Sequence, residues 1–207
     1  ALPILDGGSI SNVFTKMFGI TKDDEPVIVA LEKQGRFYRK YKMNEEMTYE
    51  NIIKFANLLE IGKAPRYFNS GLPNKNFKNS YAKELDRESY LSLMNDRSKE
   101  VFIMYYIPNC EWCLRLENIW ETLAYRNRNY RSLVIAKMDL SLNDLDDLVI
   151  TDFPTLMFYS SSANPNDPDK RQVEIYYSQK RDYRSLLKYL FSKIPELETE
   201  YKLTNDL

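Results

Sequence analysis

Histidine is absent from this chain of 207 residues. Its absence excludes Ser-His and Cys-His nucleophile pairs, metal sites built on imidazole, and acid-base catalysis by imidazole near neutral pH. Only two cysteines are present, too few for a framework of several disulfides or for a four-thiolate zinc site within one chain. The two cysteines are therefore the main candidates for chemistry.

Long hydrophobic runs are also missing, since the longest, residues 101–107, ends at Pro108 and is far shorter than the roughly 18 residues of a membrane helix. We therefore expect no membrane insertion. The 29 basic and 30 acidic residues balance to a net charge of -1, which gives no reason to expect nucleic acid as a partner. Residues 1–8 have neither the basic start nor the apolar middle of a signal peptide, so the compartment must be inferred in another way.

The hydrophobic pattern predicts an incomplete first domain at residues 1–64 and a linker rich in turn-forming residues at 65–80. The elements expected in the first domain are a strand at 1–5, a short helix capped by Ser9 or Ser11, a hairpin of strands 27–31 and 37–41, and a helix from Thr48 to near Gly62. This order of strands and helices matches only the later half of the order expected for the second domain, so the first domain is expected to be incomplete.

Residues 81–195 are expected to form a complete α/β domain, with a mixed central sheet flanked by helices. Its expected strands lie at 81–85, 101–107, 132–139, 153–159 and 172–177, with a polar loop at 164–169, and its expected helices lie at 88–94, after Cys110, at 142–149 and at 183–191. Pro195 is expected to terminate the last helix, which leaves residues 196–207 as a charged tail.

The two cysteines form the motif Cys110-Glu111-Trp112-Cys113 between a buried strand and an amphipathic helix. Two intervening residues in a first helical turn bring both sulfurs close enough to form a disulfide that opens easily. The amide groups and positive partial charge of the helix start stabilise the thiolate of Cys110. Two other interpretations stay open, namely a pair of buried structural thiols and half of a zinc site shared across a dimer.

Residues 81–194 resemble the C-terminal catalytic domain of protein disulfide isomerase, and residues 1–64 resemble the later half of the non-catalytic, substrate-binding domain that precedes it in that family. The resemblance rests on Phe18-Gly19-Ile20, Glu25-Pro26, Val101-Phe102-Ile103, Tyr106, Pro108, Ile135-Ala136-Lys137-Met138-Asp139 and Phe153-Pro154-Thr155-Leu156. It implies a thioredoxin-like fold for the complete domain and for the partial domain before it.

The resemblance also implies roles for single residues. Cys110 becomes the nucleophile and Cys113 the resolving thiol, while Lys137 and Arg181 support them. Pro154 becomes a cis-proline that faces the dithiol. A trans proline at the start of an edge strand and a solvated loop charge at Arg181 are the simpler alternatives.

Substrate contacts are expected from Phe153, Pro154, Glu111 and Trp112, because a turned-out backbone at Phe153 and an exposed Trp112 would both meet an extended polypeptide. No metal and no organic cofactor are expected. Electrons would be exchanged with glutathione or with a partner oxidoreductase, through the disulfide itself.

The sequence departs from the family at two important positions. Glu111 and Trp112 replace the usual Gly-His between the thiols, and a carboxylate at Glu111 should raise the pKa of Cys110 if it lies close. Met104 aligns with a buried glutamate that exchanges the proton of the resolving thiol, and Lys137 aligns with the lysine that pairs with it. The simpler interpretation of Met104 is a core residue in a buried strand.

We therefore expect a thiol-disulfide oxidoreductase or isomerase that acts on unfolded or misfolded polypeptides in the lumen of the endoplasmic reticulum. The location rests on the resemblance, since Thr204-Asn205-Asp206-Leu207 keeps only the final Leu of a luminal retention signal. The alternative is a chaperone-like module that binds polypeptides and carries a weak or regulatory dithiol. The oligomeric state is not predicted.

Overall fold

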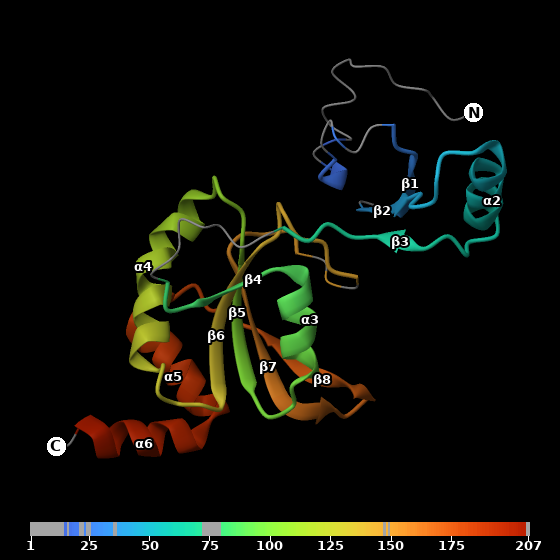
Figure 1. Ribbon diagram of the computed structural model, residues 1–207. Coiled ribbons are helices and arrows are strands. Elements are labelled where there is room, and N and C mark those ends of the chain that lie inside the picture. Colours follow the sequence, from blue (N-terminus) through green and yellow to red (C-terminus); the bar gives the residue numbers. More distant parts are fainter. Residues whose placement is uncertain are drawn as a thin grey trace. The chain divides into compact units, whose positions relative to one another are not determined.

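Two units with separate hydrophobic cores make up the chain, Ala1–Asn69 and Ser70–Leu207 (Figure 1). The computed structural model describes residues 15, 17–20, 23, 26–34, 37–71, 80–146, 148 and 150–205. The expected strand at 1–5 and the expected caps Ser9 and Ser11 lie outside these residues. Within the described residues, no helix is both long and apolar enough to cross a membrane.

The first unit contains a three-stranded sheet and one long helix. Strand β1 (Val29–Gln34) pairs antiparallel with β2 (Phe37–Lys42), so the predicted hairpin is confirmed. Helix α2 (Tyr49–Glu60) follows, and its first turn is capped by the Thr48 hydroxyl, which accepts a hydrogen bond from the Asn51 amide. The core of this unit contains Tyr41, Met43, Phe55 and Ala64.

The expected linker contributes to this first sheet. Strand β3 (Arg66–Tyr67) pairs antiparallel with β2, and the Tyr67 hydroxyl donates to the carbonyl of Phe18 at 2.7 Å. The unit therefore extends to residue 69, beyond the expected boundary at 64. A strand of two residues is too short to show an alternating hydrophobic pattern, so β3 could not be predicted from the sequence.

A five-stranded sheet with the strand order β4-β6-β5-β7-β8 organises the second unit. Its strands are β4 (Lys83–Leu85), β5 (Glu100–Tyr106), β6 (Leu133–Asp139), β7 (Thr155–Asn164) and β8 (Asp167–Ile175). The first three are parallel to one another, whereas β7 runs antiparallel to β5 and to β8. The helices are α3 (Arg87–Asn95), α4 (Glu111–Arg126), α5 (Tyr183–Lys193) and α6 (Pro195–Asn205).

Helices cover both faces of this sheet (Figure 1). Phe102, Met104 and Tyr106 of β5 face α4 and α5, and the residues that alternate with them face α3. The fully buried Trp120 fixes α4 to the sheet, because its indole Nε1 donates to the carbonyl of Ala136 in β6 at 3.0 Å. The expected mixed sheet flanked by helices is thus confirmed.

Three local expectations for this unit were wrong. Pro195 does follow the end of α5 as expected, but it also begins α6, so residues 196–205 are helical rather than a tail, and the buried Leu197 anchors this helix. The described residues between 142 and 150 contain no helix, and Leu145 and Leu148 pack on the core without one. Most of the expected loop at 164–169 belongs to β7 and β8, whose exposed hairpin lacks the apolar alternation that predicts strands.

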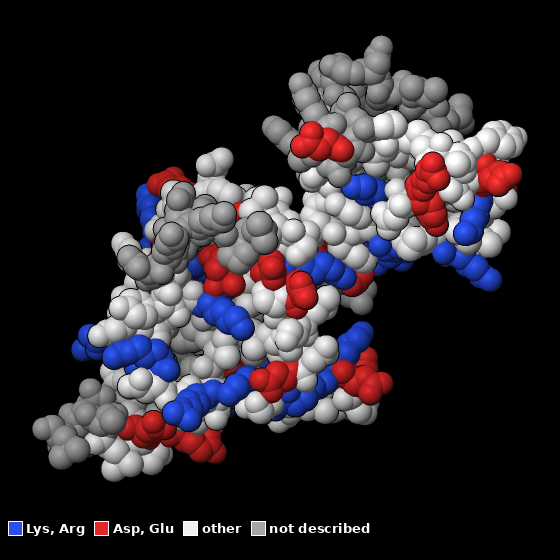
Figure 2. Space-filling view, viewed as in Figure 1, with Lys and Arg blue, Asp and Glu red and all other residues white. Residues whose placement is uncertain are grey.

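The surface of the second unit carries both signs of charge close together (Figure 2). One arginine, Arg171, is instead buried beneath the end of α3. Its guanidinium donates to the carbonyls of Met94 at 2.9 Å and Lys99 at 2.7 Å, and also to that of Asp96. It thereby satisfies carbonyl groups at and just after the end of α3, which have no helical partners.

Replacing Arg171 with Met should lower the free energy of unfolding by about 2–4 kcal/mol, because several buried carbonyl groups lose their donors at once. Urea unfolding followed by circular dichroism measures the change. Arg97→Met is the matched control, since the partly exposed Arg97 makes a single solvent-exposed hydrogen bond, to the carbonyl of Asp169, and its loss should cost less than about 1 kcal/mol. Equal losses in the two variants would contradict the structural role of Arg171.

Candidate active site

The two cysteines lie at the start of α4, directly after the central strand β5 and a short turn. Cys110 is the N-cap residue, and its Sγ accepts a hydrogen bond from the amide of Cys113 at 3.1 Å. The two residues form a disulfide with their Cα atoms 5.2 Å apart. The predicted position of the pair at a helix N-terminus is therefore confirmed, and with it the amide environment that favours a thiolate.

The two sulfur-bearing residues differ in their access to solvent. Cys113 is only 3% exposed and belongs to the core between α4 and the sheet, whereas Cys110 is half-buried. A substrate sulfur can therefore reach Cys110 more readily than Cys113. This asymmetry is what an outer nucleophile and an inner resolving thiol need.

Glu111 and Trp112, the two residues between the cysteines, both contact Arg115. The Glu111 carboxylate accepts a hydrogen bond from the Arg115 guanidinium at 2.5 Å, one helical turn away. The same guanidinium lies 4.9 Å from the centre of the Trp112 ring. The carboxylate thus has a cationic partner of its own, which weakens its effect on the Cys110 thiolate.

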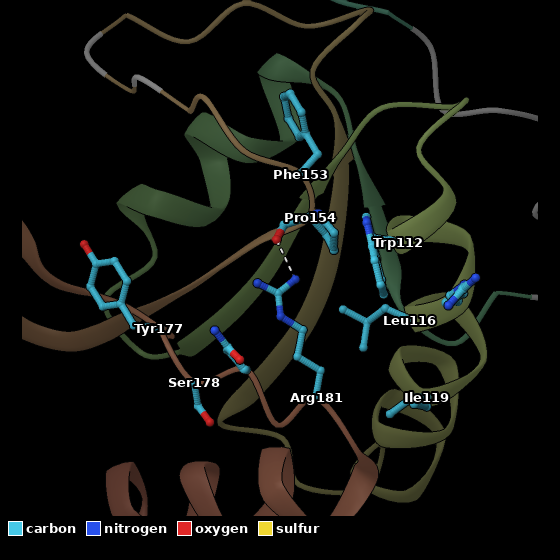
Figure 3. A pocket seen from close by; sticks show the side chains of 10 residues that line it. Trp112, Leu116, Ile119, Phe153, Pro154, Tyr177, Ser178 and Arg181 are labelled. Carbon is cyan, nitrogen blue, oxygen red and sulfur yellow. Dashed lines mark hydrogen bonds between the residues drawn. The ribbon is translucent and has the colours of Figure 1, made fainter.

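A cavity of about 490 Å³ opens next to Trp112, one of the two residues between the cysteines (Figure 3). Three segments line it: Trp112, Arg115, Leu116 and Ile119 of α4, Phe153 and Pro154 before β7, and Tyr177, Ser178, Gln179 and Arg181 after β8. The fold therefore brings together Trp112, Phe153, Pro154 and Arg181, which are far apart in the sequence. Sequence reasoning missed Arg115, Ile119 and Tyr177, although the spacing of Arg115 from Glu111 is that of a helical ion pair.

Phe153 and Pro154 are joined by a cis peptide bond, as the family resemblance implies. The carbonyl of Pro154 accepts a hydrogen bond from Arg181 Nη1 at 2.8 Å. Arg181 is therefore tied to the cavity wall rather than being a freely solvated loop charge. Its guanidinium lies within the cavity, between the cis-proline and the loop after β8 (Figure 3).

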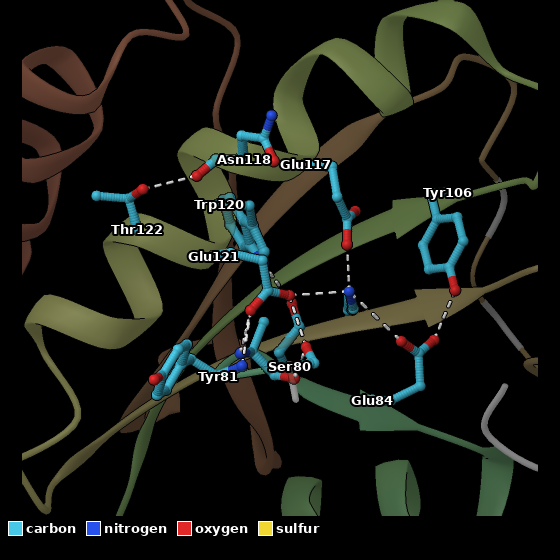
Figure 4. A network of polar contacts seen from close by, with 12 residues as sticks. Ser80, Tyr81, Glu84, Tyr106, Glu117, Asn118, Trp120, Glu121 and Thr122 are labelled. Atoms are coloured by element: carbon cyan, nitrogen blue, oxygen red, sulfur yellow. Dashed lines mark hydrogen bonds and ion pairs between the residues drawn. The ribbon is translucent and has the colours of Figure 1, made fainter. Parts of the chain in front are cut away.

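Lys137, the other predicted supporting residue, lies elsewhere, beneath the opposite flank of α4. Its ammonium group is fully buried and pairs with three carboxylates (Figure 4). The partners are Glu117 and Glu121 of α4, the latter at 2.9 Å, and Glu84 of β4 at 3.8 Å. In the sheet, Lys137 stands in register between Met104 on one side and Glu84 on the other.

The pKa values in this cluster reflect both burial and charge. Burial lowers the pKa of Lys137, but hydrogen bonds to Glu117 and Glu121 outweigh it, and the net shift is upward. Burial raises the pKa of Glu84 by more than the hydrogen bond from Tyr106 and the charge of Lys137 lower it. For Glu121, hydrogen bonds from Ser80 and Lys137 overcome the effect of burial and lower the pKa.

Among the described residues, no group of three or more His, Cys, Asp and Glu side chains is arranged to hold a metal ion. The disulfide is the one redox group that these residues provide. The disulfide at the start of α4 supports the exchange of electrons between two cysteines and an external sulfur.

Comparison with known proteins gives a family model and several relatives. The thioredoxin model matches residues 81–175, from just before β4 to the end of β8. A protein disulfide-isomerase from Gallus gallus is 29% identical over 180 residues, covering 86% of this chain and 33% of the relative. A protein disulfide-isomerase from Drosophila melanogaster is 26% identical over 149 residues, covering 72% of this chain and 30% of the relative. The chain thus spans about a third of the length of these curated relatives.

Solved structures with a similar fold include the Trx4 domain of ERdj5, with a TM-score of 0.45 and 15% identity, covering 56% of this chain and 96% of that one. Chloroplastic thioredoxin z has a TM-score of 0.42 and 16% identity, and the match covers 57% of this chain and 95% of that one.

Removing the partner of Glu111 should change the acidity of the nucleophile. In the reduced protein, Arg115→Ala is expected to raise the pKa of the Cys110 thiol, since an unpaired carboxylate at the neighbouring residue disfavours the thiolate. Glu111→Gln should lower that pKa. The rate of iodoacetamide alkylation as a function of pH measures both.

Arg128→Ala is the control, because Arg128 stacks on Tyr125 at the far end of α4, away from the dithiol. A Cys110 pKa that is the same in the Arg115→Ala, Glu111→Gln and unaltered proteins would contradict an electrostatic role for the Glu111-Arg115 pair.

Proposed function

Because the chain belongs to the protein disulfide isomerase family and its second unit has the thioredoxin-like fold, we propose that it catalyses thiol-disulfide exchange on the cysteines of folding polypeptides. The observation that carries the proposal is the disulfide between Cys110 and Cys113 at the N-terminus of α4, with Cys110 accessible and Cys113 buried. Reduction and isomerisation are favoured over oxidation because a carboxylate, Glu111, replaces the neutral or cationic residues usual at this place.

In the reduced protein, the Cys110 thiolate attacks one sulfur of a substrate disulfide, and the other substrate sulfur leaves as a thiolate. The Cys113 thiol then loses its proton and attacks the Cys110 sulfur. The bond from Cys110 to the substrate breaks, and the second substrate sulfur leaves. Two electrons have then passed from the protein to the substrate, and the protein holds the disulfide seen in the structure.

Substrate is held in the cavity next to Trp112. Its walls are largely apolar, from Trp112, Leu116, Ile119 and Phe153, which suits an apolar side chain near the substrate cysteine. The backbone of Phe153 offers its N–H and C=O groups to an extended polypeptide strand, while the carbonyl of Pro154 is taken by Arg181. Arg181 lines the cavity in the segment after β8, and we propose that Glu111 contacts substrate from the first turn of α4.

We also propose that glutathione or a partner oxidoreductase restores the other redox state, since the dithiol needs an external sulfur as electron donor or acceptor. The proposed location is the lumen of the endoplasmic reticulum, where substrates with forming disulfides occur. Equilibration of the protein with glutathione buffers of known ratio gives its reduction potential and therefore the direction of electron flow.

A second function, binding of unfolded polypeptides without chemistry, is favoured by the exposed aromatic side chains at the cavity. Trp112 is 66% exposed and Tyr177 is 82% exposed, although both are large and apolar. Such a surface retains an unfolded chain whether or not its cysteines react. Replacing the Cys110 sulfur with oxygen therefore separates disulfide exchange from polypeptide binding.

Cys110→Ser should reduce the rate of insulin disulfide reduction to background, because no accessible thiolate remains, while suppression of aggregation persists. Cys113→Ser should accumulate a covalent adduct with a disulfide-containing peptide, since nothing resolves it. Non-reducing electrophoresis detects the adduct. Full reductase activity in Cys110→Ser would disprove the proposed function, and loss of aggregation suppression in the same variant would disprove the second one.

Trp112→Ala should raise the KM for a peptide disulfide several-fold with a much smaller change in kcat, because the ring contributes binding surface rather than chemistry. Tyr125→Ala is matched to it, being another exposed aromatic on α4 that stacks with an arginine but lies outside the cavity. Equal KM values for the two variants would exclude Trp112 from substrate binding.

A further inference from the structure

The buried Lys137 holds more carboxylates than its single charge can balance. Glu84, Glu117 and Glu121 all lie against it, and two of them come from α4, the helix that carries the dithiol (Figure 4). A lysine that is fully buried needs one carboxylate to stay charged. The additional carboxylates therefore require an explanation beyond the stability of the ion pair.

Glu117 is the carboxylate of this cluster that lies nearest along the chain to Cys113. The two residues are four positions apart on α4, so they share one face of the helix with about 5–6 Å between their Cβ atoms. Long side chains on a helix lean toward its N-terminus, which brings the Glu117 side chain over the turn that carries Cys113. Glu121 is one more turn away, about 12 Å from Cys113 along the helix axis.

The thiol of Cys113 needs such a group. It is 3% exposed and lies in an apolar core, which disfavours its thiolate and limits the access of water that could take the proton. Met104 belongs to the same core and stands beside Lys137 in the sheet, but its thioether cannot accept a proton at neutral pH. Glu84 already accepts the hydroxyl of Tyr106 on the β4 side of the cluster.

We propose that Glu117, held in place by Lys137, accepts the proton of the Cys113 thiol when that sulfur attacks Cys110. This inference rests on the proposed function and names a proton acceptor for its second step. As the proton passes to the Glu117 carboxylate, the sulfur-sulfur bond between Cys113 and Cys110 forms and the bond from Cys110 to the substrate breaks. The substrate leaves as a thiolate, and Glu117 later returns its proton to solvent.

The extra carboxylates fit this role, because Lys137 is never left without a partner. When Glu117 is protonated, Glu121 at 2.9 Å and Glu84 at 3.8 Å still balance the buried ammonium group. Other polar groups around the cluster are Ser80 and the amides of Tyr81 and Ala82, which donate to Glu121, Tyr106, which donates to Glu84, and Asp139, which accepts from Ser141. Glu117 itself is 24% exposed, so it can exchange its proton with water.

The test is the lifetime of the mixed disulfide in a single turnover. Reduced protein is mixed with a peptide disulfide, quenched with acid at different times, and analysed by mass spectrometry. Glu117→Gln should lengthen the lifetime at pH 7 by about 100-fold, the lower end of what a general base contributes, while the rate of adduct formation stays the same. Glu174→Gln is the control, since it removes a carboxylate from another lysine pair, with Lys193, outside this cluster.

Rescue of Glu117→Gln by a second carboxylate distinguishes a role in proton transfer from a purely structural role. In the double variant Met104→Glu, Glu117→Gln, a new carboxylate stands next to Lys137 in register on β5, and it should restore the short lifetime. A Glu117→Gln lifetime equal to that of the unaltered protein would overturn the inference, and so would a lengthened lifetime that Met104→Glu does not shorten.

A second measurement needs no variant at Glu117. In the unaltered protein, the resolving rate should be nearly constant from about pH 6.5 to 8, because the Glu117 carboxylate takes the proton within the step and no hydroxide from solvent is needed. Loss of the proton to water would instead make the rate rise about tenfold per pH unit up to the pKa of the thiol, which would contradict the role of Glu117. Absence of any adduct in Cys113→Ser would overturn the proposed function itself, and this inference with it.

Discussion

The function of this chain depends on the junction between a buried parallel strand and the first turn of a helix. Strand β5 ends in the core at Tyr106, and within a few residues α4 begins with Cys110 as its N-cap. At that place unpaired helix amides face a sulfur atom, and one of them, from Cys113, donates to Cys110 Sγ. The rest of the domain keeps this junction rigid, chiefly through the alternate side chains of β5 on both faces of the sheet and through Trp120 of α4.

Much of this junction could be predicted from the sequence because it is local. The apolar run at 101–107 and the helical spacing after Cys110 place the dithiol without any knowledge of tertiary structure. The cavity was predicted only in part. Trp112, Phe153, Pro154 and Arg181 could be named from resemblance, but Ile119 and Tyr177 join them only because three segments converge in space.

The carboxylates around Lys137 were missed for the same physical reason. Glu84, Glu117 and Glu121 belong to β4 and α4, and nothing in their sequence spacing points to a lysine on β6. Short or polar elements were also missed, namely β3 and the extended β7-β8 hairpin, because pairing of backbone groups rather than burial of side chains holds them. Helix α6 was missed since Pro195 was interpreted as an end, although proline is equally at home in a first helical turn.

Both tryptophans of the chain lie on α4, and they occupy opposite environments. Trp120 is fully buried in the core, and its indole N–H donates a hydrogen bond to the carbonyl of Ala136, so its fluorescence should respond chiefly to unfolding. Trp112 lies between the two cysteines and is largely open to solvent, and a neighbouring disulfide quenches indole fluorescence by accepting an electron from the excited ring. The fold therefore contains its own optical probe of redox state, with one fluorophore that reports on the sulfur pair and a second that serves as an internal reference.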